Sequence, residues 1–359
     1  MANIFKLYTI YLNVTDRCNL KCAFCGVASR HSFTQELTKS EIFDLVDQAK
    51  DLGTTYCVLI GGEPFMRRDL GEIARYITSR GIRLGIATNG TLITERSLAY
   101  MDDINRDMLF LGLSLNGANP STHDSLCGVP GAFDKALRGI KVTSKKGIRL
   151  VIQTVLQSTN VLEIEDIAKI AIEHNAIYHV IPCIIPKGRG VSVVKESNLD
   201  IGEILTVANK LADLSVRYGI SVIINLPLAL LPPCLSEKGA MQCFWGINFC
   251  GILANGDVAL CHGSDFCNEC MSNEFIAGNI RTQKLREIWN NSKMFTFLRS
   301  IDPDQFEGVC GKCIIRQYCR GYCRVHAYLE YGSIYAPEPL CQWAYDKGLF
   351  PNYALEISG

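Results

Sequence analysis

The chain has 359 residues, of which 48% are hydrophobic and 20% charged, and its 36 basic and 36 acidic residues balance to zero net charge. This length predicts one large domain plus a smaller one, and the balanced charge excludes the basic footprint of a nucleic-acid-binding protein or a membrane-surface patch. Because no apolar run could span a bilayer and the N-terminus lacks the features of a secretion signal, the sequence predicts a cytoplasmic protein with no membrane partner.

Short apolar runs alternate with amphipathic helical patterns over the first two hundred residues. The predicted strands are Tyr8–Val14, Tyr56–Ile60, Leu84–Thr88, Leu109–Leu115, Leu150–Leu156 and Ile177–Ile181. The predicted helices are Lys39–Leu52, Leu70–Arg80, Thr94–Asp103, Ala132–Lys146 and Val161–Asn175, with Thr38 and Glu41 spaced as a capping box. Strands alternating with helices indicate parallel β/α units, which fit either an open barrel or a doubly wound sheet.

The second part of the chain has a different texture. A helix at Asp200–Tyr218 and an apolar run at Ile220–Leu231 lead to the boundary signal Pro232-Pro233. From about residue 241 onward, cysteines, glycines and turns replace the regular apolar pattern. Because apolar packing alone would not stabilise such a region, we expect bound metal clusters to stabilise its fold. The predicted divisions are a β/α region at 1–199, a bridging helix and strand at 200–240, a cysteine-rich domain at 241–345 and a tail at 346–359.

Seventeen cysteines in a long chain without an export signal indicate metal ligands more than disulfides. Cys18, Cys22 and Cys25 have the spacing C-x3-C-x2-C and directly follow the first predicted strand. Thiolates are the preferred ligands of iron–sulfur clusters, and a cubane takes four, so three closely spaced cysteines leave one iron open for a non-protein ligand. On this spacing alone, a zinc site or buried thiols are the alternatives.

Further motifs fall where predicted strands end, the edge at which β/α barrels bind ligands. They are Gly61-Gly62-Glu63-Pro64, Thr88-Asn89-Gly90, Ser114-Leu115-Asn116-Gly117 and Ile185-Pro186-Lys187-Gly188-Arg189-Gly190. With the three cysteines, this order of motifs resembles the radical S-adenosylmethionine (SAM) enzymes. In that family the amino and carboxylate groups of SAM chelate the open iron, and an electron from the cluster cleaves SAM to a 5'-deoxyadenosyl radical. The resemblance implies an α/β fold with a partial (β/α)6 TIM-like barrel.

The resemblance also implies which side chains contact SAM. Glu63 and its glycines would hold the amino group, and Phe24 would lie near the adenine. The full implied set is Phe24, Gly61, Gly62, Glu63, Pro64, Thr88, Asn89, Ser114, Asn116, Gln153 and Arg189. One departure is Cys127, which stands where the family segment H-D-x-x-R-G has an arginine. We expect Arg138 or Lys187 to serve in its place, and we interpret Cys127 as a replaced structural position more than a functional thiol.

A second cysteine array consists of Cys243, Cys261, Cys310, Cys313, Cys319, Cys323 and Cys341. Its spacing resembles that of the SPASM domain, which implies two auxiliary [4Fe–4S] clusters in addition to the SAM-binding cluster. The implied distal ligands are Cys310, Cys313, Cys319 and Cys341, and the implied proximal ligands are Cys243, Cys261 and Cys323, with Cys250 as the candidate fourth. Cys234, Cys267 and Cys270 lie outside the pattern. His262 matches the position of an acidic base in sulfatase maturases, which makes it a candidate catalytic base or a donor to a cluster sulfur.

These features predict hydrogen abstraction from a substrate carbon, followed by dehydrogenation, crosslinking or decarboxylation, with epimerisation as a redox-neutral alternative. As the substrate, we expect a ribosomally made peptide slightly more than a tetrapyrrole side chain or an aminoglycoside. The expected partners are an electron donor such as flavodoxin or ferredoxin and, for a peptide, a separate leader-binding protein. An iron–sulfur electron carrier or sensor would explain the cysteines, but not the motifs at the strand ends.

Overall fold

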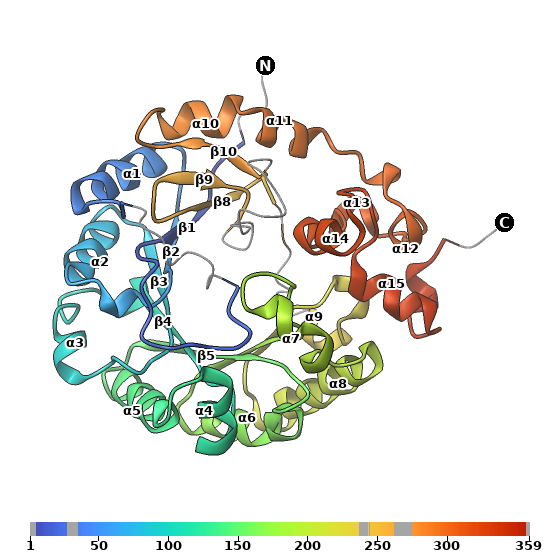
Figure 1. The fold of residues 1–359 in the computed structure, drawn as a ribbon, viewed down its shortest axis with the longest axis horizontal. Coiled ribbons are helices and arrows are strands. Elements are labelled where there is room, and N and C mark those ends of the chain that lie inside the picture. The colour runs from blue at the N-terminus through green and yellow to red at the C-terminus, as the bar shows by residue number, and fades with distance from the viewer. Residues whose placement is uncertain (1–4, 27–34, 237–242, 244, 262–274, 357–359) are drawn as a thin grey trace.

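The computed structural model describes residues 5–26, 35–236, 243, 245–261 and 275–356. Within them, ten strands form one curved sheet in the order β10-β9-β8-β1-β2-β3-β4-β5-β6-β7, with helices along its outer side (Figure 1). The strands are β1 Thr9–Asn13, β2 Tyr56–Ile60, β3 Arg83–Thr88, β4 Leu109–Ser114, β5 Arg149–Val155, β6 Ile177–Ile181, β7 Val222–Ile224, β8 Phe249–Ile252, β9 Asp257–Ala259 and β10 Ile276–Asn279.

The helices follow the strands in β/α order. The last helices of the chain, drawn in red, lie together between the orange helices and the yellow-green ones (Figure 1). They are α1 Lys39–Asp51, α2 Leu70–Ser79, α3 Glu95–Ala99, α4 Pro120–Cys127, α5 Ala132–Lys145, α6 Ile164–Glu173, α7 Gly190–Ser197, α8 Ile201–Tyr218, α9 Pro233–Ser236, α10 Leu285–Asn291, α11 Lys293–Ser300, α12 Gly308–Gly311, α13 Arg316–Cys319, α14 Arg324–Tyr331 and α15 Pro339–Asp346. No helix in these described ranges is long and apolar enough to cross a membrane.

The predicted α/β class with parallel strands is confirmed. All six predicted strands form within one residue of their expected ends, and the capping box of Thr38 and Glu41 is present at α1. Buried and more exposed residues alternate along β2 and β5, because successive side chains on a strand point to opposite faces of the sheet. In β5, Leu150 and Ile152 are buried in the apolar core, whereas Gln153 is half-buried on the other face. The inward face at the strand ends is therefore free to carry polar side chains.

The sheet extends across the first two of the three predicted boundaries, at 199/200 and 240/241. The predicted bridge contributes β7, which pairs parallel to β6. The cysteine-rich region contributes β8, which pairs parallel to β1, with Ile10 opposite Cys250 and Leu12 opposite Ile252, and β9 and β10 then continue antiparallel. Strand β1 therefore lies between β2 and a strand that is about two-thirds of the chain away. The barrel and the cysteine-rich region share one backbone hydrogen-bond network.

Arg281, just after β10, adds a side-chain link between the two regions. Its guanidinium donates to the Glu41 carboxylate of α1, with Nε 2.6 Å from Oε1. It also donates to the backbone carbonyls of Gln35, Glu36 and Asn255 at 3.0–3.2 Å. The hydrogen bond from Arg281 holds the pKa of Glu41 at about 2. A rigid fork that satisfies this many acceptors from two regions fixes their relative position.

Replacing Ile252 by alanine should destabilise both regions together, because this fully buried β8 side chain lies opposite Leu12 of β1. A loss of about 2–5 kcal/mol in the free energy of unfolding is expected for such a truncation. Anaerobic denaturant unfolding would be followed by far-ultraviolet circular dichroism and by fluorescence of Trp245, Trp289 and Trp343, which all lie in the C-terminal half. The denaturant midpoints measured by circular dichroism and by fluorescence should fall by the same amount. Val216→Ala, at an exposed helical position, should change neither midpoint. Separate transitions would contradict the shared network.

Candidate active site

The three N-terminal cysteines lie in the loop that follows β1. Cys18, Cys22 and Cys25 are each half-buried, at the carboxyl edge of the sheet where the other sequence motifs also end. Burial raises the pKa of the Cys18 thiol, and the nearby charges of Glu63, Cys22 and Cys25 raise it further. The thiols are therefore neighbours that repel one another as thiolates, and bound iron would relieve this repulsion because metal replaces their protons.

The Gly61-Gly62 pair allows the cysteine loop to pass close to the end of β2. The backbone N–H of Gly62 donates to the Thr15 carbonyl at 2.7 Å, and that of Glu63 donates to the Arg17 carbonyl at 2.7 Å. A Cβ on Gly62 would lie 2.2 Å from the Arg17 carbonyl oxygen, and one on Gly61 would lie 2.3 Å from that of Thr15. Side chains at either position would therefore push the cysteine loop away.

Glu63 joins the ends of β2 and β3. Its buried carboxylate accepts hydrogen bonds from the Thr88 hydroxyl at 2.7 Å, from the Phe65 N–H at 3.0 Å and from the Asn89 N–H at 2.7 Å. Burial raises the pKa of Glu63, and these donors oppose that rise. The Asn89 side chain in turn donates to the Cys18 sulfur at 3.9 Å. Because its oxygens are engaged by protein donors, we propose that Glu63 positions Asn89; its predicted contact with SAM stays a prediction.

The segment after β6 lies against the cysteine loop. The Arg189 N–H donates to the Cys25 carbonyl at 3.0 Å, and its guanidinium Nε donates to the Cys22 carbonyl at 2.8 Å. The Phe24 carbonyl oxygen lies 3.3 Å from the position that a Cβ on Gly190 would take. The structure thus brings together Phe24, Arg189 and the cysteines, which the sequence placed in one SAM site. Pro64 opens a short 3-10 helix directly after Glu63.

The predicted contacts on β4 and β5 differ in accessibility. Ser114 is half-buried at the end of β4, whereas Asn116 is buried and accepts a hydrogen bond from the Val155 N–H at 2.9 Å through Oδ1. Gln153 lies inside the barrel, where its Nε2 donates to His179 Nδ1 at 3.0 Å; the other ring nitrogen of His179 bonds Asn225 Oδ1 at 2.9 Å. This polar row across β5, β6 and β7 was not anticipated from the sequence, because it needs three separated strands to meet.

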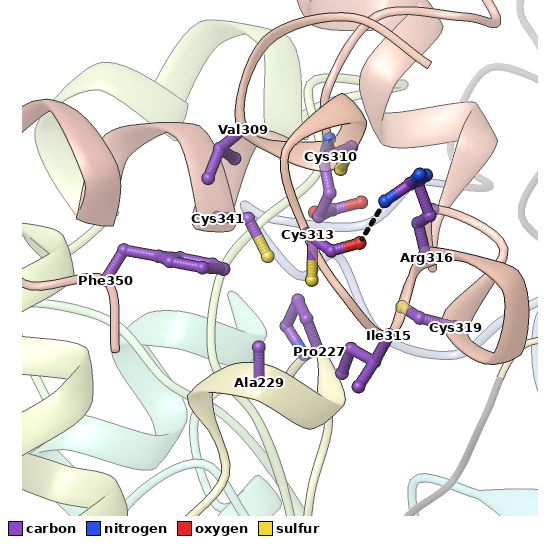
Figure 2. A pocket seen from close by; sticks show the side chains of 12 residues that line it. Pro227, Ala229, Val309, Cys310, Cys313, Ile315, Arg316, Cys319, Cys341 and Phe350 are labelled. Carbon is purple, nitrogen blue, oxygen red and sulfur yellow. Dashed lines mark hydrogen bonds between the residues drawn. The ribbon is translucent and has the colours of Figure 1, made fainter. Parts of the chain in front are cut away.

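Four cysteines of the C-terminal array surround a common cavity. Cys310, Cys313, Cys319 and Cys341 line it together with Pro227, Ala229 and Phe350 (Figure 2). Burial raises the pKa of the Cys319 thiol to about 12, and the charges of Cys310 and Cys313 add to the rise. Among the described residues, no three Cys, His, Asp or Glu side chains converge on a point where one metal ion could sit. A cubane takes one thiolate at each iron, so ligands that surround a small space fit it.

A second group of thiols lies nearer the barrel. Burial raises the pKa of the Cys243 and Cys323 thiols, and the charge of neighbouring Cys261 raises both further. Tyr11 of β1 faces the same group: burial raises its pKa to about 12, with further contributions from Cys243 and Cys261. The structure thus brings together the three cysteines that were expected to bind the proximal auxiliary cluster.

Glu338 connects the two C-terminal groups. Its backbone N–H donates to the Cys310 sulfur at 3.3 Å, while its buried carboxylate accepts from the Cys323 N–H at 3.1 Å and lies 3.0 Å from His326 Nδ1. Sequence reasoning missed this residue. The only available signal was an acidic residue three positions before Cys341, and that is too common to stand out.

The placement of Cys250 disagrees with its expected role as the fourth proximal ligand. Cys250 pairs with Ile10 and points with it into the apolar core, where burial raises the pKa of its thiol to about 12 and the charge of Arg299 opposes the rise. The inward-facing neighbour of Ile10 is Tyr11, on the side where Cys243 and Cys261 lie. Strand alternation therefore separates Cys250 from the three thiols. The predicted base His262, with Cys267 and Cys270, lies outside the described residues.

Replacing Glu63 by glutamine should weaken SAM binding. Glutamine keeps one acceptor oxygen but turns an NH2 group toward donors from Thr88, Phe65 or Asn89. Losing a buried charge-assisted hydrogen bond costs about 1–3 kcal/mol, and 1.4 kcal/mol corresponds to about tenfold in affinity. Isothermal titration of the reconstituted protein with SAM would measure the change. Glu72→Gln, at an exposed carboxylate of α2, is the matched control, and wild-type affinity in Glu63→Gln would contradict the positioning role.

Comparison with known proteins supplies the family. A model described as the Radical SAM superfamily matches residues 12–171, and one for SPASM, an iron–sulfur cluster-binding domain, matches residues 243–314. The chain is 33% identical to the AdoMet-dependent heme synthase of Methanosarcina barkeri, over 95% of this chain and 97% of that protein. It is 28% identical to the mycofactocin maturase MftC of Mycobacterium tuberculosis, over 91% of this chain and 81% of that protein.

Solved structures share the fold. The crystal structure of Streptococcus suis SuiB bound to S-adenosylmethionine superposes with a TM-score of 0.77 at 19% identity, covering 94% of this chain and 77% of that chain. Together, the two matched domains and the full-length relatives show that this chain belongs to the radical SAM superfamily, as a SPASM-type enzyme that uses SAM, a SAM-binding [4Fe–4S] cluster and auxiliary clusters.

Proposed function

We propose that this enzyme acts on a tetrapyrrole and converts a propionate side chain to a vinyl group. The observation that carries the proposal is the run of three AdoMet-dependent heme synthases among its relatives, at 33%, 30% and 30% identity over 95%, 92% and 92% of this chain. This support reverses the order expected from the sequence, in which a peptide substrate stood slightly ahead. The proposal keeps the predicted oxidative chemistry and narrows it to decarboxylation.

The reaction balances with the cofactors of the family. When bound, the clusters and SAM supply a 5'-deoxyadenosyl radical and an electron acceptor, so that R–CH2–CH2–COO⁻ yields R–CH=CH2, CO2, 5'-deoxyadenosine and one electron. Cys18, Cys22 and Cys25 would hold the SAM-binding cluster, Cys310, Cys313, Cys319 and Cys341 the distal cluster, and Cys243, Cys261 and Cys323 the proximal one.

The barrel interior offers a surface that suits a flat macrocycle. Tyr11 of β1 and Phe249 of β8 form an edge-to-face pair with ring centroids 5.9 Å apart, on the inward side near Cys243 and Cys261. Aromatic faces pack well against flat conjugated rings. The Gln153–His179–Asn225 row lies across the sheet from this pair, where its amide N–H groups could donate hydrogen bonds to the carboxylates of the substrate. The chain's part is to orient one side chain of the substrate and to exclude water from it.

Peptide modification is the second candidate. The match to mycofactocin maturase MftC, at 28% identity over 91% of this chain, favours it. Under this alternative the same residues would hold the cofactors, and a peptide would enter at the strand ends. The electron donor, the separate leader-binding protein and the cytoplasmic location remain predictions from the sequence.

The two candidates predict different stimulants of SAM cleavage. The anaerobically reconstituted protein, with SAM and a reductant, should form 5'-deoxyadenosine faster with a propionate-bearing tetrapyrrole such as Fe-coproporphyrin III. Mass spectrometry should show loss of the elements of formic acid, with one 5'-deoxyadenosine for each side chain converted. Stimulation by a peptide fraction of cell extract, with none by the tetrapyrrole, would overturn the proposal in favour of peptide modification.

A variant with Cys18, Cys22 and Cys25 all changed to alanine should lose SAM cleavage, because no protein ligands remain for the cluster that reduces SAM. The auxiliary thiols are untouched, so the variant should still bind iron and sulfide in reduced amount. The readouts are 5'-deoxyadenosine by chromatography and iron and sulfide by chemical analysis. Cys234→Ala, at a half-buried cysteine outside both arrays, should retain cleavage, and activity in the triple variant would rule out this cluster site.

A further inference from the structure

Cys127, which the sequence suggested was only a replaced structural position, lies against the cysteine loop. It is the last residue of α4 and is 2% exposed. With Leu20 and Ala132 it forms a small apolar cluster against which Cys18 and Cys22 pack. The Cys127 and Cys22 thiols lie close enough for each to shift the pKa of the other. A fourth sulfur therefore adjoins the three that are assigned to the SAM-binding cluster.

Backbone hydrogen bonds fix this contact from both sides of Cys22. The N–H of Lys21 donates to the Cys127 carbonyl at 3.0 Å, and the N–H of Ala23 donates to the Leu126 carbonyl at 3.1 Å. These carbonyls belong to the last turn of α4, where no helical N–H is available to them. The cysteine loop thus caps the helix and, in doing so, holds Cys22 opposite Cys127.

The approach also depends on Gly128, which follows Cys127. Its backbone is left-handed, with φ of +68°, and a Cβ there would lie 2.7 Å from the Lys21 carbonyl oxygen. Gly128 therefore ends α4, and its lack of a side chain lets the cysteine loop come close enough for the sulfurs of Cys22 and Cys127 to lie near each other.

The environment of Cys127 determines the direction of its hydrogen bonds. His123 Nδ1 accepts the Asn116 N–H at 3.0 Å, and burial lowers the pKa of His123 to about 4, so the ring is neutral and its proton sits on Nε2. This Nε2–H points at the Cys127 sulfur, 3.4 Å away.

Asn116 lies on the same side of the thiol. Its Oδ1 accepts from the Val155 N–H at 2.9 Å, so its side-chain NH2 is the group that can face Cys127. With the Nε2–H of His123 directed at the sulfur, the S–H of Cys127 is left to point toward Cys22.

We propose that Cys127 is a positioning residue for the SAM-binding cluster, donating its S–H to the Cys22 sulfur while Cys22 is bound to iron. The inference rests on the assignment of Cys18, Cys22 and Cys25 to this cluster. Hydrogen bonds to ligand sulfurs help set the reduction potential of an iron–sulfur cluster. A donor withdraws electron density from the thiolate and stabilises the more negative reduced cluster, so removing it lowers the midpoint potential.

The test is a redox titration of the reconstituted full-length protein, followed by electron paramagnetic resonance. The signal that changes when SAM is added identifies the SAM-binding cluster without removing the auxiliary ones. In Cys127→Ala, the ratio of reduced to oxidised cluster at a fixed potential should fall about tenfold, which is 59 mV for a one-electron couple. Cys127→Ser keeps a donor and should lie closer to wild type, and Cys234→Ser, which alters a cysteine outside both arrays, should match wild type.

A second variant covers the case in which Cys127→Ala fails to assemble its cluster. His123→Asn keeps an acceptor for the Asn116 N–H but removes the donor to Cys127, so the potential should fall by a smaller amount in the same direction. An unchanged or raised potential in Cys127→Ala, or in His123→Asn when that variant alone assembles, overturns the proposal. A full SAM-responsive cluster in Cys22→Ala also overturns it, because Cys127 would then be an iron ligand. If wild-type protein shows no SAM-responsive signal, the cluster assignment itself fails.

Discussion

Backbone hydrogen bonds hold the cysteine loop after β1, and the arrangement of the whole site depends on them. The donors or acceptors come from the ends of β2, α4 and β6: Gly62 and Glu63 donate to the loop, Leu126 and Cys127 accept from it, and Arg189 donates to it. A loop without regular structure costs conformational entropy to order, and these partners offset that cost from three directions. Because the partners are main-chain groups, the loop needs close approach, which explains the glycines at 61, 62 and 128.

The C-terminal groups are organised on a different principle. Their thiols are buried and held by short helices and turns, and Glu338 bonds to the backbone or sulfur of a cysteine in each group. A buried carboxylate among thiols is costly unless it is hydrogen-bonded, and here His326 and the Cys323 N–H provide partners. Glu338 thus links the two groups of thiols that are assigned to the auxiliary clusters.

The sequence predicted the β/α half of the fold well because each strand there is a separate apolar run followed by a helix. It missed β8, β9 and β10 because they are only three or four residues long, which is too short for an alternation to be recognised. The error at Cys250 follows directly: without knowing that it lies on a strand, its face could not be assigned. Glu63 and Asn116 were predicted to contact SAM, but their hydrogen-bond partners come from other strands, which no local pattern reveals. The contact of Cys127 with the cysteine loop was not predicted for the same reason, since only the fold brings the two together.

The parallel pairing of β1 with β8 has a consequence for biosynthesis. Residues 9–13 and the three cysteines of the adjoining loop are made long before residues 249–252, so one edge of β1 stays unpaired until β8 has been synthesised. Unpaired strand edges in incomplete chains are prone to wrong associations. A nascent chain therefore carries the loop of Cys18, Cys22 and Cys25 beside an open strand edge until β8 is made. During that interval, iron–sulfur delivery and chaperones would meet a chain that has these three cysteines but not yet those from Cys261 onward.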